Sequence, residues 1–472
     1  MHDSIRKIHF IGIGGVGMSG IARVAAEQGY TVSGSDLRKS RYTDQLEEAG
    51  VTVFVGQKAD NILATTPDVV VISTAILENN PELMRARELG LPIWHRAKML
   101  AHLGLGLETL AVAGTHGKTT TSSMLASTLD ALGEDPTFLI GGIVRAYGSN
   151  AHCGKGKYYV VEADESDKSF TYLDPACVLV TNVEADHLDH YSGLDEIYSL
   201  FAEFMESVPE EGHCVVCGDD IKLAELARAT GRKVTTYGFG STCDTVVSNY
   251  VTSGVSTSFD LRLPDGTMVS AGVKQNPGRH NALNAAGVIT LLWACGYDPQ
   301  KVADALRGFA GVRRRFDLVG EAAGVTVVDD YGHHPTEIAA TLAAAKALDF
   351  KHVHIVFQPH RYSRVKLFTE VLKDDFSQAF DDADTVTFMD VYPAGEMPVP
   401  GVNGSTFMQV VLDHEGHPRD TTYVERRQDL AQHVMERVCP GDLVLTMGAG
   451  DVTAMGPEIL RALRERESQE QA

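Results

Sequence analysis

The chain has 472 residues, 44% of them hydrophobic, which suits two to four globular domains better than a single core. Its formal net charge of −22 argues against nucleic acid and anionic lipid surfaces as partners. No apolar run reaches the roughly 18 residues of a membrane span and no signal-peptide pattern precedes the first expected strand. We therefore expect a cytoplasmic protein that does not insert into membranes.

The first segment, residues 1–106, opens with an expected strand over 7–13, a glycine-rich turn and a helix that ends near Gly29. A second strand over 30–35 leads to Asp36, and residues 69–73 form another apolar run. Continuous apolar strands are typical of a parallel sheet that is covered on both faces.

The turn after the first strand has the sequence Gly12-Ile13-Gly14-Gly15-Val16-Gly17. Its glycines would let the backbone approach a diphosphate, whose charge the dipole of the following helix would favour. A purely structural turn and an NAD site remain alternatives to another nucleotide diphosphate.

The second segment, residues 107–312, begins with an apolar strand that ends before Gly114, and strands follow over 158–162, 177–183 and 213–217. Residues 233–275 are punctuated by turns and are expected to form a small antiparallel sheet. A helix is expected from about Arg279. Cys214 and Cys217 have metal-like spacing but lie within an apolar strand, so we expect buried thiols, as free thiols are expected for all seven cysteines.

The most informative run of this segment is Ala111-Val112-Ala113-Gly114-Thr115-His116-Gly117-Lys118-Thr119-Thr120-Thr121. A glycine-bracketed loop lies between an apolar strand and a helix expected from about Thr120, so several backbone N–H groups can converge on an anion. Lys118 would contact the β- and γ-phosphates, and the Thr119 hydroxyl would bind Mg²⁺. The run predicts a nucleoside triphosphate site.

Acidic residues follow the next two buried strands. Glu162-Ala163-Asp164-Glu165-Ser166-Asp167 ends one strand and Thr181-Asn182-Val183-Glu184-Ala185-Asp186-His187 ends the other. Oxygen ligands at the carboxyl ends of parallel strands suit Mg²⁺. We predict metal ligation by Glu162 and His187, with a solvated charged face and a structural histidine as the alternatives.

The third segment, residues 313–472, repeats the alternating plan, with strands expected over 325–329, 352–358, 385–390 and 443–447 and a helix over 336–348. Its polar tail, residues 464–472, is expected to fray. Arg361 and Arg364 follow a strand and match a carboxylate ligand, with pairing on a helix surface as the alternative. The run Arg313-Arg314-Arg315 lies at the expected domain boundary and could meet an anionic substrate there. An interdomain salt bridge is the alternative role.

Together these motifs resemble those of the Mur ligases, the ATP-dependent amide-forming enzymes of bacterial cell-wall synthesis, and most closely those of the alanine-adding branch. The resemblance also includes Gly278-Arg279-His280-Asn281-Ala282-Leu283-Asn284 and the runs 331–337, 357–364 and 390–396. It implies an α/β protein of three domains: a Rossmann-like N-terminal domain, a central P-loop ATPase-like domain with a mostly parallel sheet and a small antiparallel sheet, and a Rossmann-like C-terminal domain.

The resemblance also implies the ligands: a UDP-sugar, UDP-N-acetylmuramate, in the first domain, Mg²⁺ and ATP in the second and L-alanine in the third. The UDP-sugar would contact Gly14, Gly15, Val16, Gly17, Asp36 and Ser73. ATP would contact Gly114, Thr115, His116, Gly117, Lys118, Thr119, Thr120, Asn281, Arg315 and Asp330. L-Alanine would contact His333, Arg361 and Arg364, and the metal ligands would be Thr119, Glu162 and His187. Catalysis would fall to Lys118 and His333.

The implied reaction joins L-alanine to the lactyl carboxylate of the sugar through an acyl phosphate. The recycling ligase that adds a tripeptide to the same sugar is the nearest alternative. An NAD-dependent oxidoreductase and a nucleotide-switched binding protein are alternatives of other classes. The sequence leaves three points open: the ligands of a second metal ion near the triphosphate, a monomer–dimer equilibrium, and how strictly the site prefers L-alanine.

Overall fold

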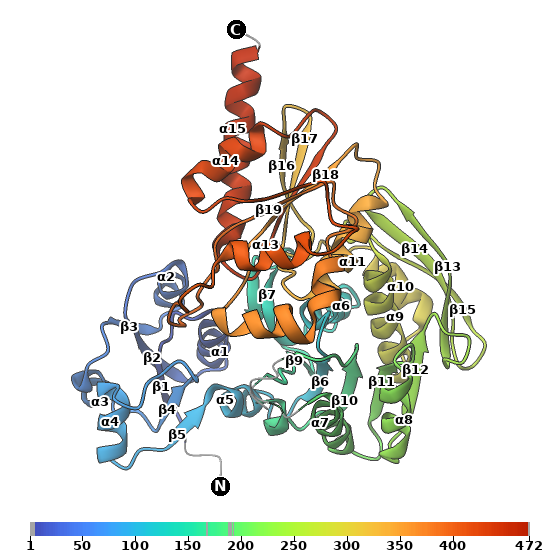
Figure 1. The fold of residues 1–472 in the computed structure, drawn as a ribbon. Coiled ribbons are helices and arrows are strands. Elements are labelled where there is room, and N and C mark those ends of the chain that lie inside the picture. The colour runs from blue at the N-terminus through green and yellow to red at the C-terminus, as the bar shows by residue number, and fades with distance from the viewer. Residues whose placement is uncertain (1–4, 167–168, 187–190, 192, 471–472) are drawn as a thin grey trace. The chain divides into compact units, whose positions relative to one another are not determined.

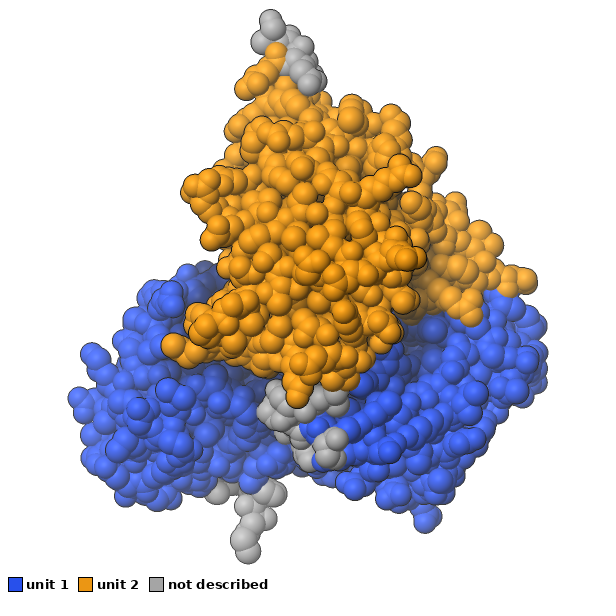
Figure 2. Space-filling view, in the orientation of Figure 1, with its two compact units in different colours: residues 1–248, 260–271, 283–309 blue, residues 249–259, 272–282, 310–472 orange. Residues whose placement is uncertain are grey.

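The computed structural model describes residues 5–166, 169–186, 191 and 193–470. They form an α/β fold with three sheets, of five, ten and six strands (Figure 1). The chain divides into two compact units, which Figure 2 colours separately: unit 1 is residues 1–248, 260–271 and 283–309, and unit 2 is residues 249–259, 272–282 and 310–472. The domain bounds at 106/107 and 312/313 stay predictions.

The five-stranded sheet of unit 1 has the order β3-β2-β1-β4-β5, and all its neighbours are parallel. Ile8 and Phe10 pack into the core on one face, whereas Ile11 packs on the other, so β1 is buried on both sides as its apolar run predicted. The strands are β1 (Lys7–Ile11), β2 (Thr31–Asp36), β3 (Thr52–Val55), β4 (Val69–Ile72) and β5 (Ile93–His95). The helices are α1 (Val16–Glu27), α2 (Arg41–Glu48), α3 (Ala59–Thr65), α4 (Pro81–Glu88) and α5 (Arg96–Leu103).

The ten-stranded sheet has the order β15-β14-β13-β12-β11-β10-β6-β9-β7-β8. The run from β12 to β7 is parallel, and β8 is antiparallel to β7. Its strands are β6 (Glu108–Ala113), β7 (Thr137–Val144), β8 (Ser149–His152), β9 (Tyr158–Glu162), β10 (Cys177–Val180), β11 (His213–Cys217), β12 (Val234–Gly238), β13 (Thr245–Ser253), β14 (Ser256–Arg262) and β15 (Met268–Val273). The accompanying helices are α6 (Lys118–Ala131), η1 (Ser169–Tyr172), α7 (Leu194–Glu206), α8 (Ile221–Ala229), α9 (Arg279–Ala294) and α10 (Pro299–Leu306).

The turn-rich region 233–275 joins this sheet instead of forming one of its own. β12 is buried along four of its five residues and pairs in parallel with β11, so it belongs to the interior ladder. The alternating burial of β13 is that of a strand with one solvated face, and β13, β14 and β15 continue the sheet to its edge. Residues of β13, β14, β15 and α9 are divided between the two units.

The six-stranded sheet of unit 2 has the order β16-β17-β21-β18-β19-β20, in which only β16 is antiparallel to its neighbour. Separate apolar clusters cover its two faces. The strands are β16 (Asp317–Ala322), β17 (Val325–Asp330), β18 (Val353–Phe357), β19 (Thr385–Phe388), β20 (Asp420–Tyr423) and β21 (Leu443–Met447). The helices are α11 (Pro335–Lys346), η2 (Tyr362–Arg364), η3 (Leu367–Val371), α12 (Lys373–Gln378), α13 (Gly404–Leu412), α14 (Arg427–Met435), η4 (Asp451–Ala454) and α15 (Met455–Glu470).

The C-terminal tail differs from its prediction, because α15 continues to Glu470. Ile459 and Leu463 are fully buried, and Arg466 donates from Nη1 to the carbonyl oxygens of Met435 at 3.2 Å and Val438 at 3.3 Å. These contacts hold a segment whose composition alone suggested fraying. Within the described part of the chain, no helix combines the length and apolarity needed to cross a bilayer.

Candidate active site

The predicted phosphate loop joins β6 to α6 in unit 1. The helix begins at Lys118, two residues before the predicted start, because Gly117 caps it with a φ of +81°. Gly114 also has a positive φ, +130°, and a Cβ there would collide with the Thr181 hydroxyl. Both positions therefore require glycine.

The loop is held by the segment that follows β10. The Thr115 N–H donates to the Asn182 carbonyl at 3.0 Å, and the His116 N–H donates to Asn182 Oδ1 at 2.9 Å. Asn182 Nδ2 in turn donates to the His116 carbonyl at 3.0 Å. Asn182 lies in the predicted motif after β10 but had no predicted role. Its side-chain amide accepts from the N–H of His116 and donates to the carbonyl of the same residue, which holds the loop in place. Thr120 lies buried in the first turn of α6.

Lys118 lies over this loop with its side chain only 13% exposed. Its Nζ donates to the carbonyl oxygens of Gly114 at 2.5 Å and Thr115 at 3.1 Å, and to Glu165 Oε1 at 2.9 Å. Burial alone lowers the pKa of Lys118, but the carboxylates of Glu165, Asp164 and Glu162 outweigh it and raise the pKa. Lys118 therefore keeps its charge at neutral pH.

Glu165 is a residue that the sequence analysis did not single out within the acidic run. Its side chain is 3% exposed, and burial raises its pKa to about 7 against the opposing charge of Lys118. The Tyr191 hydroxyl donates to the Glu165 carbonyl. The acidic run indicates that functional carboxylates continue beyond Glu162, but its residue order does not distinguish one carboxylate from another.

Thr119 and Glu162 meet as the metal prediction requires. The Thr119 hydroxyl lies 3.0 Å from both carboxylate oxygens of Glu162, and the Gly141 N–H donates to Glu162 Oε2 at 2.7 Å. A hydroxyl and a carboxylate beside a phosphate loop are the hard oxygen ligands that Mg²⁺ takes, so the donor set fits this ion. His187, the other predicted ligand, lies outside the described residues.

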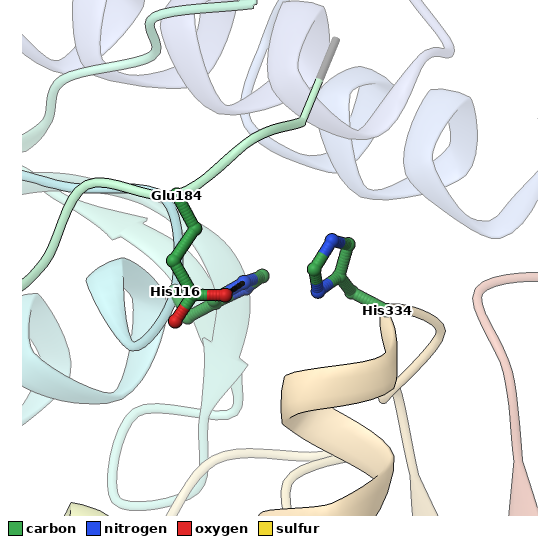
Figure 3. Close-up of side chains that lie close together, drawn as sticks. All are labelled: His116, Glu184 and His334. Carbon is green, nitrogen blue, oxygen red and sulfur yellow. Dashed lines mark ion pairs between the residues drawn. The ribbon is translucent and has the colours of Figure 1, made fainter. Parts of the chain in front are cut away.

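His116 pairs with an acidic residue from the next strand end. Its Nε2 lies 3.4 Å from Glu184 Oε2 (Figure 3). Figure 3 also shows His334, which stands at the start of α11 in unit 2.

α9 contributes two asparagines. A Cβ on Gly117 would come within 2.8 Å of Asn284 Oδ1, so the side chain of Asn284 lies directly against the loop. Asn281 donates from Nδ2 to the Pro277 carbonyl at 2.8 Å. Asn281 belongs to unit 2 and Asn284 to unit 1, and the contact of Asn281 with adenine stays a prediction.

A backbone N–H of the glycine-rich turn after β1 is bonded by a side chain of the same sheet. The Gly14 N–H donates to Asp36 Oδ2 at 2.9 Å, and Gly15 is the N-cap of α1. A Cβ on Gly12 would lie 3.3 Å from Ile76, which places the turn beside the segment that follows β4. Ser73 begins that segment and accepts a hydrogen bond from the Ile76 N–H at 3.1 Å.

Two further residues of unit 1 support the first turn of α1. Asn150 donates from Nδ2 to the Val16 carbonyl at 3.1 Å. A Cβ on Gly17 would lie 3.8 Å from Arg96 Nη1, and Arg96 Nη2 lies 3.4 Å from Asp164 Oδ2. Arg96 thus links the glycine-rich turn to the strand end that carries Glu162. It was not predicted, since no motif marks it.

In unit 2 the buried carboxylate at the end of β17 organises its surroundings. Asp330 accepts from the N–H groups of Phe316 at 2.7 Å and Gly332 at 2.8 Å. Burial raises its pKa to about 6, against the charge of Arg315. The guanidinium of Arg315 lies over the Tyr331 ring at 4.8 Å. Asp330 and Arg315 are therefore neighbours, as their shared predicted role requires.

Arg314 makes structural contacts inside unit 2, which differ from the interdomain salt bridge that is the alternative role of the arginine run. It donates from Nη2 to the carbonyl oxygens of Gly448 at 2.5 Å and Gly450 at 3.0 Å. Its Nε lies 3.5 Å from Asp329.

The three residues predicted to bind the amino acid gather around His360. His333 lies with its ring centroid 5.8 Å from that of His360, and its Nδ1 is 3.3 Å from Glu337. Burial, followed by the charges of Arg364 and Arg361, lowers the pKa of His360 to about 4. The Arg361 N–H donates to the Tyr392 carbonyl at 2.8 Å, and its φ of +69° turns the chain at this point. Two guanidinium groups beside a neutral imidazole suit a carboxylate ligand.

Comparison with known proteins covers all three sheets. The models named "Mur ligase family, catalytic domain", "Mur ligase middle domain" and "Mur ligase, glutamate ligase domain" match residues 7–106, 112–292 and 314–450. A curated UDP-N-acetylmuramate–L-alanine ligase from Geobacter sp. (strain M21) is 45% identical over 98% of this chain and 99% of its own. One from Anaeromyxobacter dehalogenans (strain 2CP-1) is 47% identical over 98% of each chain.

Two solved structures resemble the fold over nearly its whole length. A UDP-N-acetylmuramate-alanine ligase from Thermotoga maritima has a TM-score of 0.81 at 29% identity, covering 98% of this chain and 99% of its own. A murein peptide ligase from Psychrobacter arcticus has a TM-score of 0.70 at 26% identity, covering 97% and 98%. The predicted fold class of three α/β domains is confirmed. The chain therefore belongs to the Mur ligase family.

Proposed function

We propose that this chain joins L-alanine to the lactyl carboxylate of UDP-N-acetylmuramate with the use of ATP, in peptidoglycan precursor synthesis. The observation that carries the proposal is the similarity, over 98% of the chain, to relatives that bear the name of this ligase. The phosphate loop with Lys118, Thr119 and Glu162 supplies the chemistry that such a reaction needs.

The reaction has a clear physical requirement. A carboxylate resists attack by an amine, because its charge repels the nucleophile and an oxide ion is a poor leaving group. Transfer of the γ-phosphoryl group of ATP to the carboxylate forms an acyl phosphate and releases ADP. The neutral amine of L-alanine then attacks the acyl carbon, and phosphate leaves as the amide bond forms. Preorganised positive charge must stabilise the developing oxyanion.

Lys118 is the proposed source of that charge. Its ammonium already lies against the backbone carbonyls of the loop and the Glu165 carboxylate, and it would exchange part of this contact for phosphate oxygens. Before the nucleotide binds, Glu165 would hold the buried ammonium of Lys118 in the position where it meets the phosphates. The Asn284 side chain, which abuts Gly117, would restrict the loop to this shape.

Mg²⁺ is proposed to bind at Thr119 and Glu162, where it would neutralise phosphate charge. Glu162 is oriented for this by the Gly141 N–H, and the Thr119 hydroxyl lies within hydrogen-bond distance of the same carboxylate. His187 is a proposed further ligand. The metal also explains why a carboxylate stands beside a site for an anionic nucleotide.

The remaining substrates are assigned to the other two strand-end sites. The sugar nucleotide would bind at the glycine-rich turn, where Asp36 caps Gly14 and Arg96 lies beside Gly17. L-Alanine would bind through Arg361 and Arg364, with His333 as proton acceptor or orienting group for its amine. Arg315 and Asp330 would contact the nucleotide.

The recycling tripeptide ligase is the second candidate, because a murein peptide ligase is also structurally similar. The alanine ligase is favoured because curated relatives with that name are 45–47% identical over 98% of the chain, and because the solved alanine ligase has a TM-score of 0.81 against 0.70 for the murein peptide ligase. An NAD-dependent oxidoreductase would leave the phosphate loop without a purpose. A nucleotide-switched binding protein is excluded if turnover depends on the amino acid.

The test measures ADP release by the full chain with UDP-N-acetylmuramate, ATP and Mg²⁺, adding L-alanine, glycine, L-serine or the tripeptide one at a time. L-Alanine is expected to give the highest kcat/KM. Faster release with the tripeptide would favour the recycling reaction, and release that ignores the added amine would contradict both ligase readings. Reduction of NAD by the same mixture is expected to be absent.

We also propose a cytoplasmic location, where the nucleotide substrates are found. Free thiols agree with it: Cys214 and Cys217 are buried, and burial raises the pKa of each to about 12, which makes them inert. The proposed monomer–dimer equilibrium is testable by sedimentation over a concentration series.

A further inference from the structure

The C-terminal sheet carries a cluster of imidazole and carboxylate groups at the edge opposite its strand-end site. His352 directly precedes β18, His354 is its second residue, and Asp442 directly precedes β21. Asp330 ends β17, and His360 and Arg361 follow the carboxyl end of β18. At about 3.3 Å per residue, the five residues of β18 separate the two edges by about 15 Å.

Both imidazoles converge on one buried carboxylate. His352 Nδ1 lies 3.0 Å from Asp442 Oδ1, and His354 Nε2 lies 3.1 Å from Asp442 Oδ2. One potential ligand atom from each of the three residues lies within 4.8 Å of the other two. The Asp442 carboxylate is 1% exposed, and its pKa is lowered, against the effect of burial, by the Cys439 N–H and both histidines.

We propose that His352, His354 and Asp442 form a binding site for a late first-row transition-metal ion of the Zn²⁺ class. Ligand atoms around tetrahedral Zn²⁺, at bond lengths of about 2.0–2.1 Å, lie about 3.3 Å apart. The two nitrogen–oxygen separations are 3.0 and 3.1 Å, each to a different oxygen of Asp442, and one ligand atom from each residue lies within 4.8 Å of the others, so side-chain rotations would have to bring the three ligand atoms closer together. Two imidazoles and one carboxylate select such an ion over Mg²⁺, which prefers oxygen ligands.

The surroundings of His354 support a metal ligand. Its second ring nitrogen, Nδ1, lies 2.9 Å from the hydroxyl of Thr385, the first residue of β19. A partner on the second nitrogen holds the ring in place, as it does for histidines that bind metals, and a hydroxyl can accept the proton that Nδ1 carries when Nε2 binds the ion. His354 is 7% exposed, so the ring has little freedom to turn away.

To bind a metal, Nδ1 of His352 and Nε2 of His354 would each have to be free of a proton. The other ring nitrogen would then carry it: Nε2 of His352 belongs to a side chain that is 55% exposed to water, and Nδ1 of His354 would donate to the Thr385 hydroxyl. The exposed side also leaves room for a water as fourth ligand.

The ion would join the starts of three neighbouring strands. Val353 of β18 pairs with Leu443 of β21, and His354 pairs with Thr385 of β19. A metal bound to His352, His354 and Asp442 would thus link β18 to β21, with β19 fixed through Thr385. Its role would be to stabilise the C-terminal sheet, independent of the ligase chemistry.

The test titrates the full chain with Co²⁺ in excess Mg²⁺, which saturates oxygen sites, and follows the visible absorption of tetrahedral cobalt. The background is Cys439→Ser, because this exposed thiol would otherwise compete for the ion. We expect Co²⁺ to bind at a site that His352→Ala weakens, Zn²⁺ to displace it, and Zn²⁺ to raise the melting temperature.

His352→Ala removes an exposed ligand and should weaken Co²⁺ binding at least tenfold, and the buried Asp442→Asn should do the same. His414→Ala is the matched control, since His414 pairs with Asp381 at 3.2 Å as an ordinary histidine–carboxylate pair. It should bind Co²⁺ like the background. Unchanged affinity in His352→Ala, or loss of all binding through Cys439→Ser alone, would overturn the proposal.

Discussion

Lys118 is a buried cation whose charge is balanced before any nucleotide arrives. Two backbone carbonyls and Glu165 hold its ammonium, while Thr119, the next residue of α6, contacts Glu162 at the end of β9. Such an arrangement keeps the cation oriented at the site where phosphate charge develops, so little reorganisation accompanies the reaction.

The first prediction concerns this residue. Lys118→Ala should lower kcat by about a thousandfold, because a preorganised charge in a water-poor site contributes strongly to the transition state. Steady-state ADP release measures it. The control is Lys157→Ala, which removes an exposed lysine that pairs with Glu108 at 3.2 Å. Near-normal kcat in Lys118→Ala, with the protein folded, would remove Lys118 from catalysis.

A second prediction concerns Arg361. Arg361→Ala should raise the KM for L-alanine on the order of tenfold or more and change kcat less, since a hydrogen bond to a charged group contributes about 1.5–3 kcal/mol. KM is measured at saturating ATP and sugar nucleotide. Arg426→Ala, an exposed arginine that pairs with Asp429, should leave KM unchanged. An unaltered KM in Arg361→Ala would exclude it from the amino-acid site.

At the scale of elements, the strand–loop–helix unit from β6 to α6 was predictable because its glycines, lysine and threonine have a fixed order. The helix start was placed two residues late, since only the structure reveals that Gly117 closes the loop with a positive φ. The separate sheet expected over 233–275 was not predictable, because which neighbour a strand pairs with depends on distant residues. The roles of Glu165, Asn284 and Arg96 were hidden for the same reason.

Gly117 provides a prediction at this scale. Gly117→Ala combines a strained positive φ with a contact of 2.8 Å to Asn284, so it should distort the loop and lower kcat/KM for ATP at least about tenfold. Gly133→Ala is the matched control, because Gly133 has a φ of +87° and nothing within 4 Å of its Cβ. It should cost about 1 kcal/mol of stability and leave kinetics intact. Equal kinetic effects in both variants would contradict a loop-specific role.

At the scale of the whole molecule, the stability of the chain should depend on the pH through His280. Burial lowers its pKa to about 4, although Glu337 opposes the shift. At this residue the unfolded chain, with a pKa near 6.5, binds more protons, so the contribution of His280 to the free energy of unfolding falls as the pH drops from about 6.5 to about 4, whereas Glu165 and Asp330, whose pKa values are raised, contribute in the opposite direction. The loss is at most about 3 kcal/mol.

Urea unfolding at pH 7.5 and pH 5 checks this effect. His280→Gln should reduce the difference between the two pH values, whereas His414→Gln should preserve it. A His280→Gln chain that keeps the full wild-type difference between the two pH values would contradict the assignment.

The three sheets and their strand-end sites were predictable from apolar runs followed by glycine or charged residues, as with β6, β9 and β17. The partners of the charged residues were not predictable. Asp36 accepts a hydrogen bond from the Gly14 N–H, and Arg314 donates to the Gly448 carbonyl within unit 2. Those contacts depend on backbone positions that no short motif encodes.

Following one oxygen atom through the reaction tests whether the chain forms an acyl phosphate and transfers it to L-alanine. UDP-N-acetylmuramate labelled with ¹⁸O in its lactyl carboxylate would be incubated with the chain, ATP, Mg²⁺ and L-alanine. We predict an alanyl product and one ¹⁸O atom in the released phosphate, since the carboxylate oxygen leaves with the phosphoryl group. Unlabelled phosphate, or turnover only when the tripeptide replaces L-alanine, would contradict the account.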